Sequence, residues 1–216
     1  YWTSRDEYLA YKEAHPGYKS FNDGKISGGD VKYLAQGNPD HQIGAGSGTK
    51  EDHGDLVYLG NSNARYLYGF NISAQWKGFD FSMMFQGVGK RKIMIDAAAI
   101  APFYTTYQMP WTIHRDYWTE DNQDAFWPRL YDYKTNNGGE NFNFRPSDKW
   151  VQDASYLRLK NITLGYTIPY TKKYVNSVRV YITGNDIWEH SDLLKVFDPE
   201  AGNNVCLLYT SDAADE

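Results

Sequence analysis

Strict alternation of apolar and other residues is the feature of this sequence that most restricts its fold. From Tyr66 to Trp76 every second residue is apolar or aromatic, and those between are mostly small or polar. A period of two predicts a β-strand whose two faces meet different surroundings. The segment matches the roughly 9–11 residues that a tilted strand needs to cross a bilayer. Its terminal rings would lie at the two interfaces.

The pattern resumes with the same polarity directly after Lys77-Gly78. From Phe79 to Gln86, apolar residues again occupy every second position. Two long segments joined by a two-residue turn that contains glycine predict a β-hairpin with its apolar residues on one face. A soluble β-sandwich would have shorter strands and more β-branched core residues, so the hairpin favours a membrane barrel.

A second hairpin is expected further along the chain. Alternation runs from Tyr156 to Ile168, Pro169–Ser177 is expected to form the turn, and alternation then continues from Val178 to Asn185. A strand-turn-strand unit of this kind again predicts antiparallel pairing.

The first half of this second hairpin breaks the pattern. Leu157 and Leu159 fall on the polar face, whereas Arg158 and Lys160 fall on the apolar face. Either a β-bulge shifts the phase of the strand, or this part projects above the hydrocarbon layer, where charges cost little.

The connections between the expected strands alternate in length. Short turns on one side and long loops on the other are typical of outer-membrane barrels, with the short turns in the periplasm. A brief Ala-rich helix is expected from Asp96 to Ala101, ended by Pro102. The sequence thus predicts an all-β fold, a fragment of an antiparallel transmembrane β-barrel with about four long strands. Its expected parts are an extracellular loop region (1–65), a barrel hairpin (66–88), an extracellular loop with the short helix (89–150), a second barrel hairpin (151–188) and another extracellular loop (189–204).

The composition supports a barrel but also fits another class of protein. Aromatic residues make up 17% of the chain, as 19 Tyr, 10 Phe and 7 Trp, yet the mean hydropathy is -0.67. Barrels mix lipid-facing apolar residues, aromatic girdles and polar lumens in this way, and a secreted β-rich carbohydrate-binding module would do so nearly as well. The net charge of -5 argues against nucleic acid as a partner, because phosphate binding needs a basic face.

The long insertion between the hairpins holds the best candidates for ligand contact. Its rings could stack on sugars, or could pack the loop against itself or against a partner protein. The candidate cargo- or partner-contacting residues are Tyr104, Tyr107, Trp111, Trp118 and Trp127.

No residue pattern predicts catalysis, a cofactor or a metal. The stretch Asn22–Asp30 resembles a calcium loop, but aligning Gly24 with the loop's sixth position leaves Lys19 and Phe21 where oxygen ligands belong, which favours a structural turn. The five histidines have no metal-ligand spacing. A glycan hydrolase would need two carboxylates at a fixed separation, which sequence cannot show. We therefore expect no catalytic, cofactor-binding or metal site, and no enzyme.

Five collinear groups of motifs resemble the SusC/RagA family of TonB-dependent outer-membrane transporters. They span roughly residues 17 to 202 in order, and the strings that carry the resemblance are Gly60–Gly69 with Trp76–Arg91, Trp118–Arg129, Ala154–Pro169, Val178–Trp188 and Asp198–Glu200.

The resemblance implies what the whole transporter would be. The family has a 22-stranded barrel with an N-terminal plug, is powered by the TonB system and is capped by a SusD-like surface lipoprotein. Its cargo is oligosaccharide or, in some members, peptide. The implied location is the outer membrane of a Gram-negative, Bacteroidetes-type bacterium, with the barrel in contact with lipid.

Both ends of the chain are expected to be cut ends. Tyr1 follows no signal peptide, and the resemblance places this chain near the C-terminus of the transporter, without plug, TonB box or terminal strand. Residues 205–216, which contain Cys206, resemble adaptor read-through and are expected to be non-native.

Overall fold

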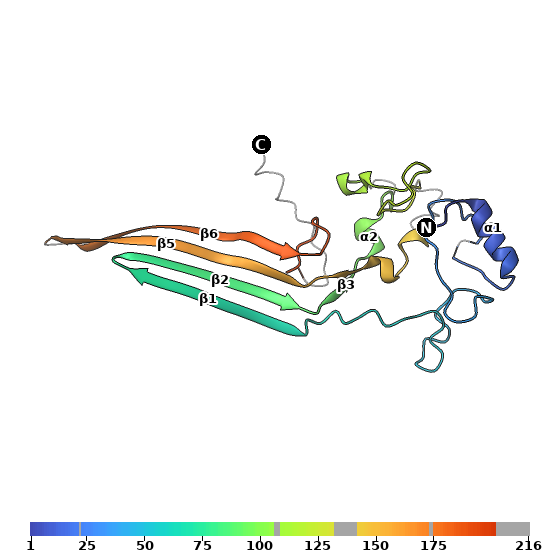
Figure 1. Ribbon diagram of the computed structural model, residues 1–216, viewed down its shortest axis with the longest axis horizontal. Helices are drawn as coiled ribbons and strands as arrows, with labels where there is room; N and C mark the ends of the chain where they lie inside the picture. The colour runs from blue at the N-terminus through green and yellow to red at the C-terminus, as the bar shows by residue number, and fades with distance from the viewer. Residues whose placement is uncertain (22, 106–108, 132–141, 173–174, 202–216) are drawn as a thin grey trace. The chain divides into compact units, whose positions relative to one another are not determined.

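The computed structural model describes residues 1–201 apart from 22, 106–108, 132–141 and 173–174 (Figure 1). These residues form two compact units, which we call the sheet unit (Leu59–Ile95 and Val151 onward) and the loop unit (Tyr1–Tyr58 and Asp96–Trp150). Residues 205–216, expected to be non-native, lie outside the described residues. No helix among the described residues combines the length and hydropathy needed to span a membrane.

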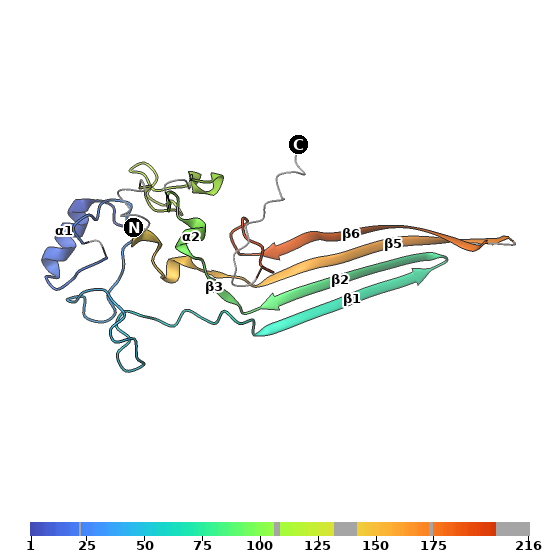
Figure 2. The same ribbon diagram turned by 180° about the vertical axis from the view of Figure 1, so that it is seen from behind.

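The sheet unit is built on four long antiparallel strands in the order β1-β2-β5-β6. Figure 2 shows the same strands from behind, still side by side. The predicted class, an antiparallel sheet of four long strands, is confirmed. Their bounds are Tyr66–Trp76 for β1, Phe79–Gly89 for β2, Tyr156–Lys172 for β5 and Val175–Ser191 for β6.

The turn between β1 and β2 has the two residues predicted for it. Trp76 pairs with Phe79 across the turn. Lys77 and Gly78 both have positive φ, at 47° and 88°, which is typical of the type I′ turn whose twist matches a right-twisted hairpin. The short turn places the apolar rows of both strands on one face.

A β-bulge at Lys160 resolves the broken alternation of β5. Relative to β2 Lys160 is an extra residue, because the adjacent Met84 and Phe85 pair with Asn161 and Leu159. The register toward β6 also shifts here, because Asn161 pairs with Asn185 but Leu159 pairs with Trp188. The extra residue reverses the phase of the strand. Leu159 pairs with Phe85 and so lies on the apolar face, which corrects the assignment of Leu157 and Leu159 to the polar face.

The turn between β5 and β6 is much shorter than predicted. The prediction of a turn over Pro169–Ser177 is wrong, because β5 continues to Lys172 and Pro169 pairs with Ser177. Pro169 lies beyond the last β2–β5 pair, Phe79 with Tyr166. With a neighbouring strand on one side only, a residue without an N–H is tolerated in the ladder.

All the long connections leave the sheet at one end. Tyr66 pairs with Gly89 and Val88 with Tyr156, which in turn pairs with Ser191. The end of β2 leads into a second, two-stranded sheet of β3 (Lys92–Met94) and β4 (Val151–Asp153). The sheet thus has one end with short turns, which we call the turn end, and one end with long connections, which we call the loop end. That the loop end is extracellular stays a prediction.

The loop unit begins with a helix that the alternation analysis missed. Helix α1 spans Arg5–Ala14, and Ser4 caps it by accepting a hydrogen bond from the Glu7 backbone N–H at 3.1 Å. The Glu7 carboxylate reaches back to the Thr3 N–H at 2.7 Å. Ser followed three residues later by Glu is a sequence signal of a helix start, so this element could have been predicted.

The remaining elements of the loop unit are short. Helix α2 confirms the helix expected between Asp96 and Ala101, and the Asp96 side chain caps it by accepting a hydrogen bond from the Ala98 N–H at 2.8 Å. Their bounds are Ala97–Ile100 for α2, Thr112–Arg115 for the 3₁₀ helix η1, Phe142–Phe144 for η2 and Asp148–Trp150 for η3.

A buried carboxylate joins the two chain segments of the loop unit. Asp30 is fully buried and accepts hydrogen bonds from the Asn143 amide at 3.0 Å and the Tyr131 hydroxyl at 2.8 Å. Asn143 also accepts from the Val31 N–H at 2.8 Å. Burial raises the pKa of Asp30, and the hydrogen bond from Asn143 opposes that effect. Asn143 thus pairs the buried Val31 N–H and supplies one of the donors that the buried Asp30 carboxylate needs.

Replacing Asn143 with alanine should destabilise the loop unit by about 2–3 kcal/mol, because a buried acceptor and a buried N–H both lose a partner. Hydrogen exchange of the Val31 and Trp150 amides in the intact protein would measure the change. Asn122→Ala is a matched control, because Asn122 is exposed and bonds Asp116 at the surface. Equal effects of the two substitutions would contradict the role given to Asn143.

Candidate functional site

One face of the long sheet is an uncovered apolar surface. Phe70, Leu164 and Ile182 are 46%, 49% and 72% exposed. By register they belong to rows that run across all four strands. No second sheet covers this face among the described residues, as these exposed fractions show. Members of the rows, which we call the apolar face, include Phe70, Ile72, Ala74, Phe81, Met83, Phe85, Ile162, Leu164, Val180 and Ile182.

Rings gather at both ends of the apolar face. At the turn end Phe79 packs against Tyr166 with ring centroids 4.5 Å apart, next to Trp76. At the loop end Tyr68 reaches across to donate a hydrogen bond to the Tyr156 carbonyl at 3.2 Å, and Trp188 pairs with Leu159. The arrangement is an apolar band with tyrosine and tryptophan residues at its two ends.

The opposite face, which we call the polar face, carries hydrogen-bonding side chains. The Asn161 amide donates to Asn185 at 2.8 Å and to Thr183 at 3.1 Å. Thr163 lies next to Thr183, with 2.9 Å between their hydroxyl oxygens. These groups satisfy one another across β5 and β6 and leave a hydrated surface.

An ion pair spans three strands on the polar face near the turn end. Arg179 of β6 donates to Asp80 of β2 at 2.5 and 3.0 Å, although β5 lies between those strands. The pair passes over Gly165, where a Cβ would lie 2.5 Å from an Asp80 oxygen. A side chain at this position would displace the ion pair from this geometry.

The predicted loop aromatics divide into buried and partly exposed residues. Trp118 and Trp127 are 7% and 2% exposed, whereas Tyr104 and Trp111 are half-buried. Tyr107 lies outside the described residues. Direct contact with a ligand is therefore open to Tyr104 and Trp111, and the two buried tryptophans belong to the interior of the loop unit.

Ring stacking explains the burial of Trp127. Its ring stacks on Trp150 at 5.7 Å, and Trp150 stacks in turn on Phe144 at 4.7 Å. The edge of His114 contacts Trp127 at 4.7 Å. The Trp118 N–H donates to the Trp127 carbonyl at 2.9 Å. The insertion therefore folds on its own aromatic residues.

His114 is buried in this stack as a neutral ring. Its Nδ1 accepts from the Trp111 N–H at 2.8 Å, and its Nε2 lies 2.7 Å from the Ile100 carbonyl oxygen. One nitrogen thus accepts and the other donates, which suits the uncharged tautomer. Burial lowers the pKa of His114 below its ordinary value.

The calcium-like stretch and the other candidate metal ligands form turns and side-chain pairs within the protein. Asp23 of the calcium-like stretch bonds Lys12 at 2.5 Å, and Asp30 is saturated by protein donors. Asn22 lies outside the described residues. His41 pairs with Asp55 at 2.9 Å. Residues 1–201, with the gaps given above, contain no cluster of three or more His, Cys, Asp or Glu side chains that could hold a metal ion.

No family model matches the chain. It is 28% identical over 180 residues to the TonB-dependent receptor P26 of Formosa agariphila, a match that covers 78% of this chain. A second receptor of that organism, TonB-dependent receptor P3, is 25% identical over 154 residues. The chain is thus similar in sequence to TonB-dependent receptors. It spans only 17% and 14% of the length of these two proteins.

Solved structures give the same kind of partial match. Two structures of the RagAB peptide importer, in its open-open and closed-closed states, are 26% identical to the chain. Each match covers 65% of this chain and 15% of the importer chain, with TM-scores of 0.46 and 0.48. The resemblance to TonB-dependent receptors is confirmed by the two relatives of Formosa agariphila, which are both named as receptors.

The loop unit should lose stability as the pH falls, and His114 should contribute to the loss. Because the pKa of His114 is lowered in the folded state, the unfolded state takes up its proton first, below about pH 6.5. Proteinase K cleavage within residues 96–131, normalised to an unfolded substrate, should rise between about pH 7 and pH 5. His114→Gln should flatten this rise. His53→Gln, at an exposed position, should leave it unchanged, and an unchanged profile in the first variant would contradict the assignment.

Proposed function

We propose that this chain is part of a TonB-dependent importer in the outer membrane of a Gram-negative, Bacteroidetes-type bacterium. The observation that carries the proposal is the apolar face, an exposed apolar band with tyrosine and tryptophan residues at both ends, on strands long enough to cross a bilayer. Lipid is the surrounding that such a face requires, and a single solvated sheet would leave it as an aggregation-prone surface.

The dimensions of the sheet support a membrane crossing. Strand β1 has 11 residues, or about 37 Å at roughly 3.4 Å per residue. Tilted by about 45°, such a strand spans about 26 Å, close to the apolar band of an outer-membrane barrel. The rings of Trp76 and Tyr66 at its two ends would then lie at the two interfaces.

The alternative, a secreted carbohydrate-binding module, requires a second layer over the apolar face. The exposed rows argue against this in the described residues, and both curated relatives are receptors. We likewise propose no enzymatic activity and no cofactor, because transport by such a receptor needs neither.

Cargo and partners follow from the resemblance to SusC/RagA-like transporters. We propose oligosaccharide as cargo, with peptide as the second candidate, a SusD-like surface lipoprotein as partner, and the TonB system acting through a part of the receptor beyond this chain. In this arrangement the loop unit lies outside the cell. Tyr104 and Trp111 are the proposed contacts with cargo or partner. Trp118 and Trp127 would act indirectly, by fixing the shape of the loop unit, and Tyr107 keeps its predicted role.

Two adjacent residues on opposite faces test the membrane proposal. In the full-length receptor, Ile72→Arg places a charge in the lipid-facing band and should cost about 2–4 kcal/mol, whereas Ser73→Arg should cost little, because it faces the lumen. The measurement is the amount of folded, heat-modifiable receptor in isolated outer membranes. Equal assembly of both variants would rule out a lipid-facing apolar face.

A second pair of variants tests the role of the loop aromatics. Trp111→Ala should lower cargo uptake or lipoprotein binding without changing the amount of folded receptor, since its ring is only half-buried. Trp118→Ala should also loosen the loop unit and raise its protease sensitivity, because truncating a buried tryptophan costs about 3–5 kcal/mol. Unchanged uptake and partner binding in both variants would exclude these residues from the function.

A further inference from the structure

The chain that follows β6 contacts polar-face side chains at the loop end of the sheet. We call Asp192–Ala201 the strap. Its Leu193 and Phe197 side chains are buried, and the Leu194 N–H donates to the Gln152 side chain at 3.0 Å. The backbone hydrogen bonds of the described strap run within it, from Phe197 to Leu194 and from Ala201 to Asp198. Its attachment to the sheet is therefore made by side chains.

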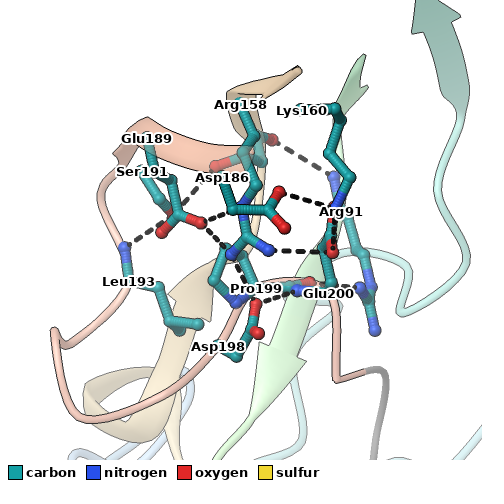
Figure 3. A network of polar contacts seen from close by, with 11 residues as sticks. Arg91, Arg158, Lys160, Asp186, Glu189, Ser191, Leu193, Asp198, Pro199 and Glu200 are labelled. Atoms are coloured by element: carbon teal, nitrogen blue, oxygen red, sulfur yellow. Dashed lines mark hydrogen bonds and ion pairs between the residues drawn. The ribbon is translucent and has the colours of Figure 1, made fainter. Parts of the chain in front are cut away.

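Arg158 of β5 is the centre of that attachment (Figure 3). Its guanidinium binds Glu189 of β6, with Nε at 2.6 Å, and reaches two carboxylates of the strap, Asp198 at 2.7 Å and Glu200 at 2.8 Å. Arg158 itself is only 8% exposed. Its planar group with several fixed donors can satisfy several carboxylates at once, which a lysine cannot do equally well.

Two more cations support the same contact. Lys160 bonds Asp186 of β6 at 2.8 Å and Glu200 of the strap at 3.0 Å. Arg91, which follows β2, donates to the Pro199 carbonyl at 3.0 Å. Figure 3 shows these groups converging on the segment from Asp198 to Glu200.

The β-bulge explains why these cations meet on one face. Without the extra residue, Arg158 would point with Phe85 into the apolar face. The phase shift at Lys160 turns Arg158 to the polar face, where its carboxylate partners lie. Bulges re-aim side chains in this way.

The charges of the cluster are unequal. Arg158 and Lys160 face four carboxylates, those of Asp186, Glu189, Asp198 and Glu200. Loss of Arg158 would leave Glu189, Asp198 and Glu200 close together with Lys160 as the remaining ion-pair partner. Like charges repel most strongly where water is partly excluded. Loss of Arg158 thus shifts the balance of charges at the strap from attraction toward repulsion.

We propose that the strap is a conformational device with Arg158 as its clasp, closed in this structure and opening as a unit when the Arg158 contacts break. This inference rests on the proposed function for its location, because in a barrel the polar face lines the lumen. An open strap would widen the lumen at its loop end, and a closed one would narrow it.

The test is hydrogen exchange, read by mass spectrometry, on the full-length receptor in detergent micelles. Arg158→Met should speed exchange of strap amides roughly 10- to 100-fold, as expected when one partner is removed from a buried charge cluster. Arg158→Met combined with Glu189→Gln should recover part of the protection, because it removes excess negative charge. Loss of packing alone would not be recovered in this way.

Matched variants set the controls. Arg179→Met removes an arginine from the same face but from the pair with Asp80, so strap exchange should stay as in the wild type. Asp198→Asn should have little effect, since Arg158 keeps two carboxylates. If Arg158→Met does not fold, the double variant Asp198→Asn/Glu200→Gln replaces it, and it should also release the strap.

The outcomes separate the inference from the proposed function. Strap exchange equal to wild type in a folded Arg158→Met receptor, or equal release by Arg179→Met, would overturn the clasp while leaving the importer intact. A wild-type receptor that does not assemble in outer membranes would overturn the importer itself.

Discussion

The extra residue at Lys160 is the constraint on which the two faces of the sheet depend. In a strand with a side-chain period of two, a change of face can be made only by adding or removing a residue. The bulge keeps Leu157 and Leu159 in register with the apolar rows and sends Arg158 to the other side. One insertion thus keeps a charge off the apolar face and supplies the centre of the polar cluster.

The loop unit depends on a different constraint, because its buried polar groups need hydrogen-bond partners. Its core of tryptophan, tyrosine and phenylalanine rings encloses Asp30, Asn143 and His114. Each of these has partners that match its donors and acceptors, so the aromatic core can form without leaving a buried charge or amide unpaired. A long insertion can in this way fold as a compact body with little regular secondary structure.

Much of the sheet could be predicted from alternation alone. The bounds of β1 and its two-residue turn follow from the pattern, because each residue there obeys the period of two. The sequence could not distinguish a β-bulge from a strand that projects above the hydrocarbon layer, because both produce the same residue pattern. The turn after β5 is predicted in the wrong place because proline usually marks the end of a strand. Pro169 is tolerated here because β2 has already ended and no longer pairs with β5. The sequence does not show where β2 ends relative to β5.

The candidate site was less predictable than the fold. Aromatic residues in the insertion look alike in sequence, and only the stack with Trp150 and Phe144 shows that Trp127 is interior. The cluster around Arg158 joins residues 31 to 42 positions apart, and no local pattern brings them together. Helix α1, in contrast, had a local signal in Ser4 and Glu7.

The ion pair that crosses Gly165 has a mechanical consequence for β5. Near the turn end the pair ties β2 to β6 across the strand, and near the loop end the register of β5 shifts against both neighbours at the same place. A slip of β5 by two residues would preserve the alternation of faces, but it would bring a side chain under the ion pair and mismatch the bulge. The strand is pinned at two points, so the sheet can twist and bend while β5 cannot slide.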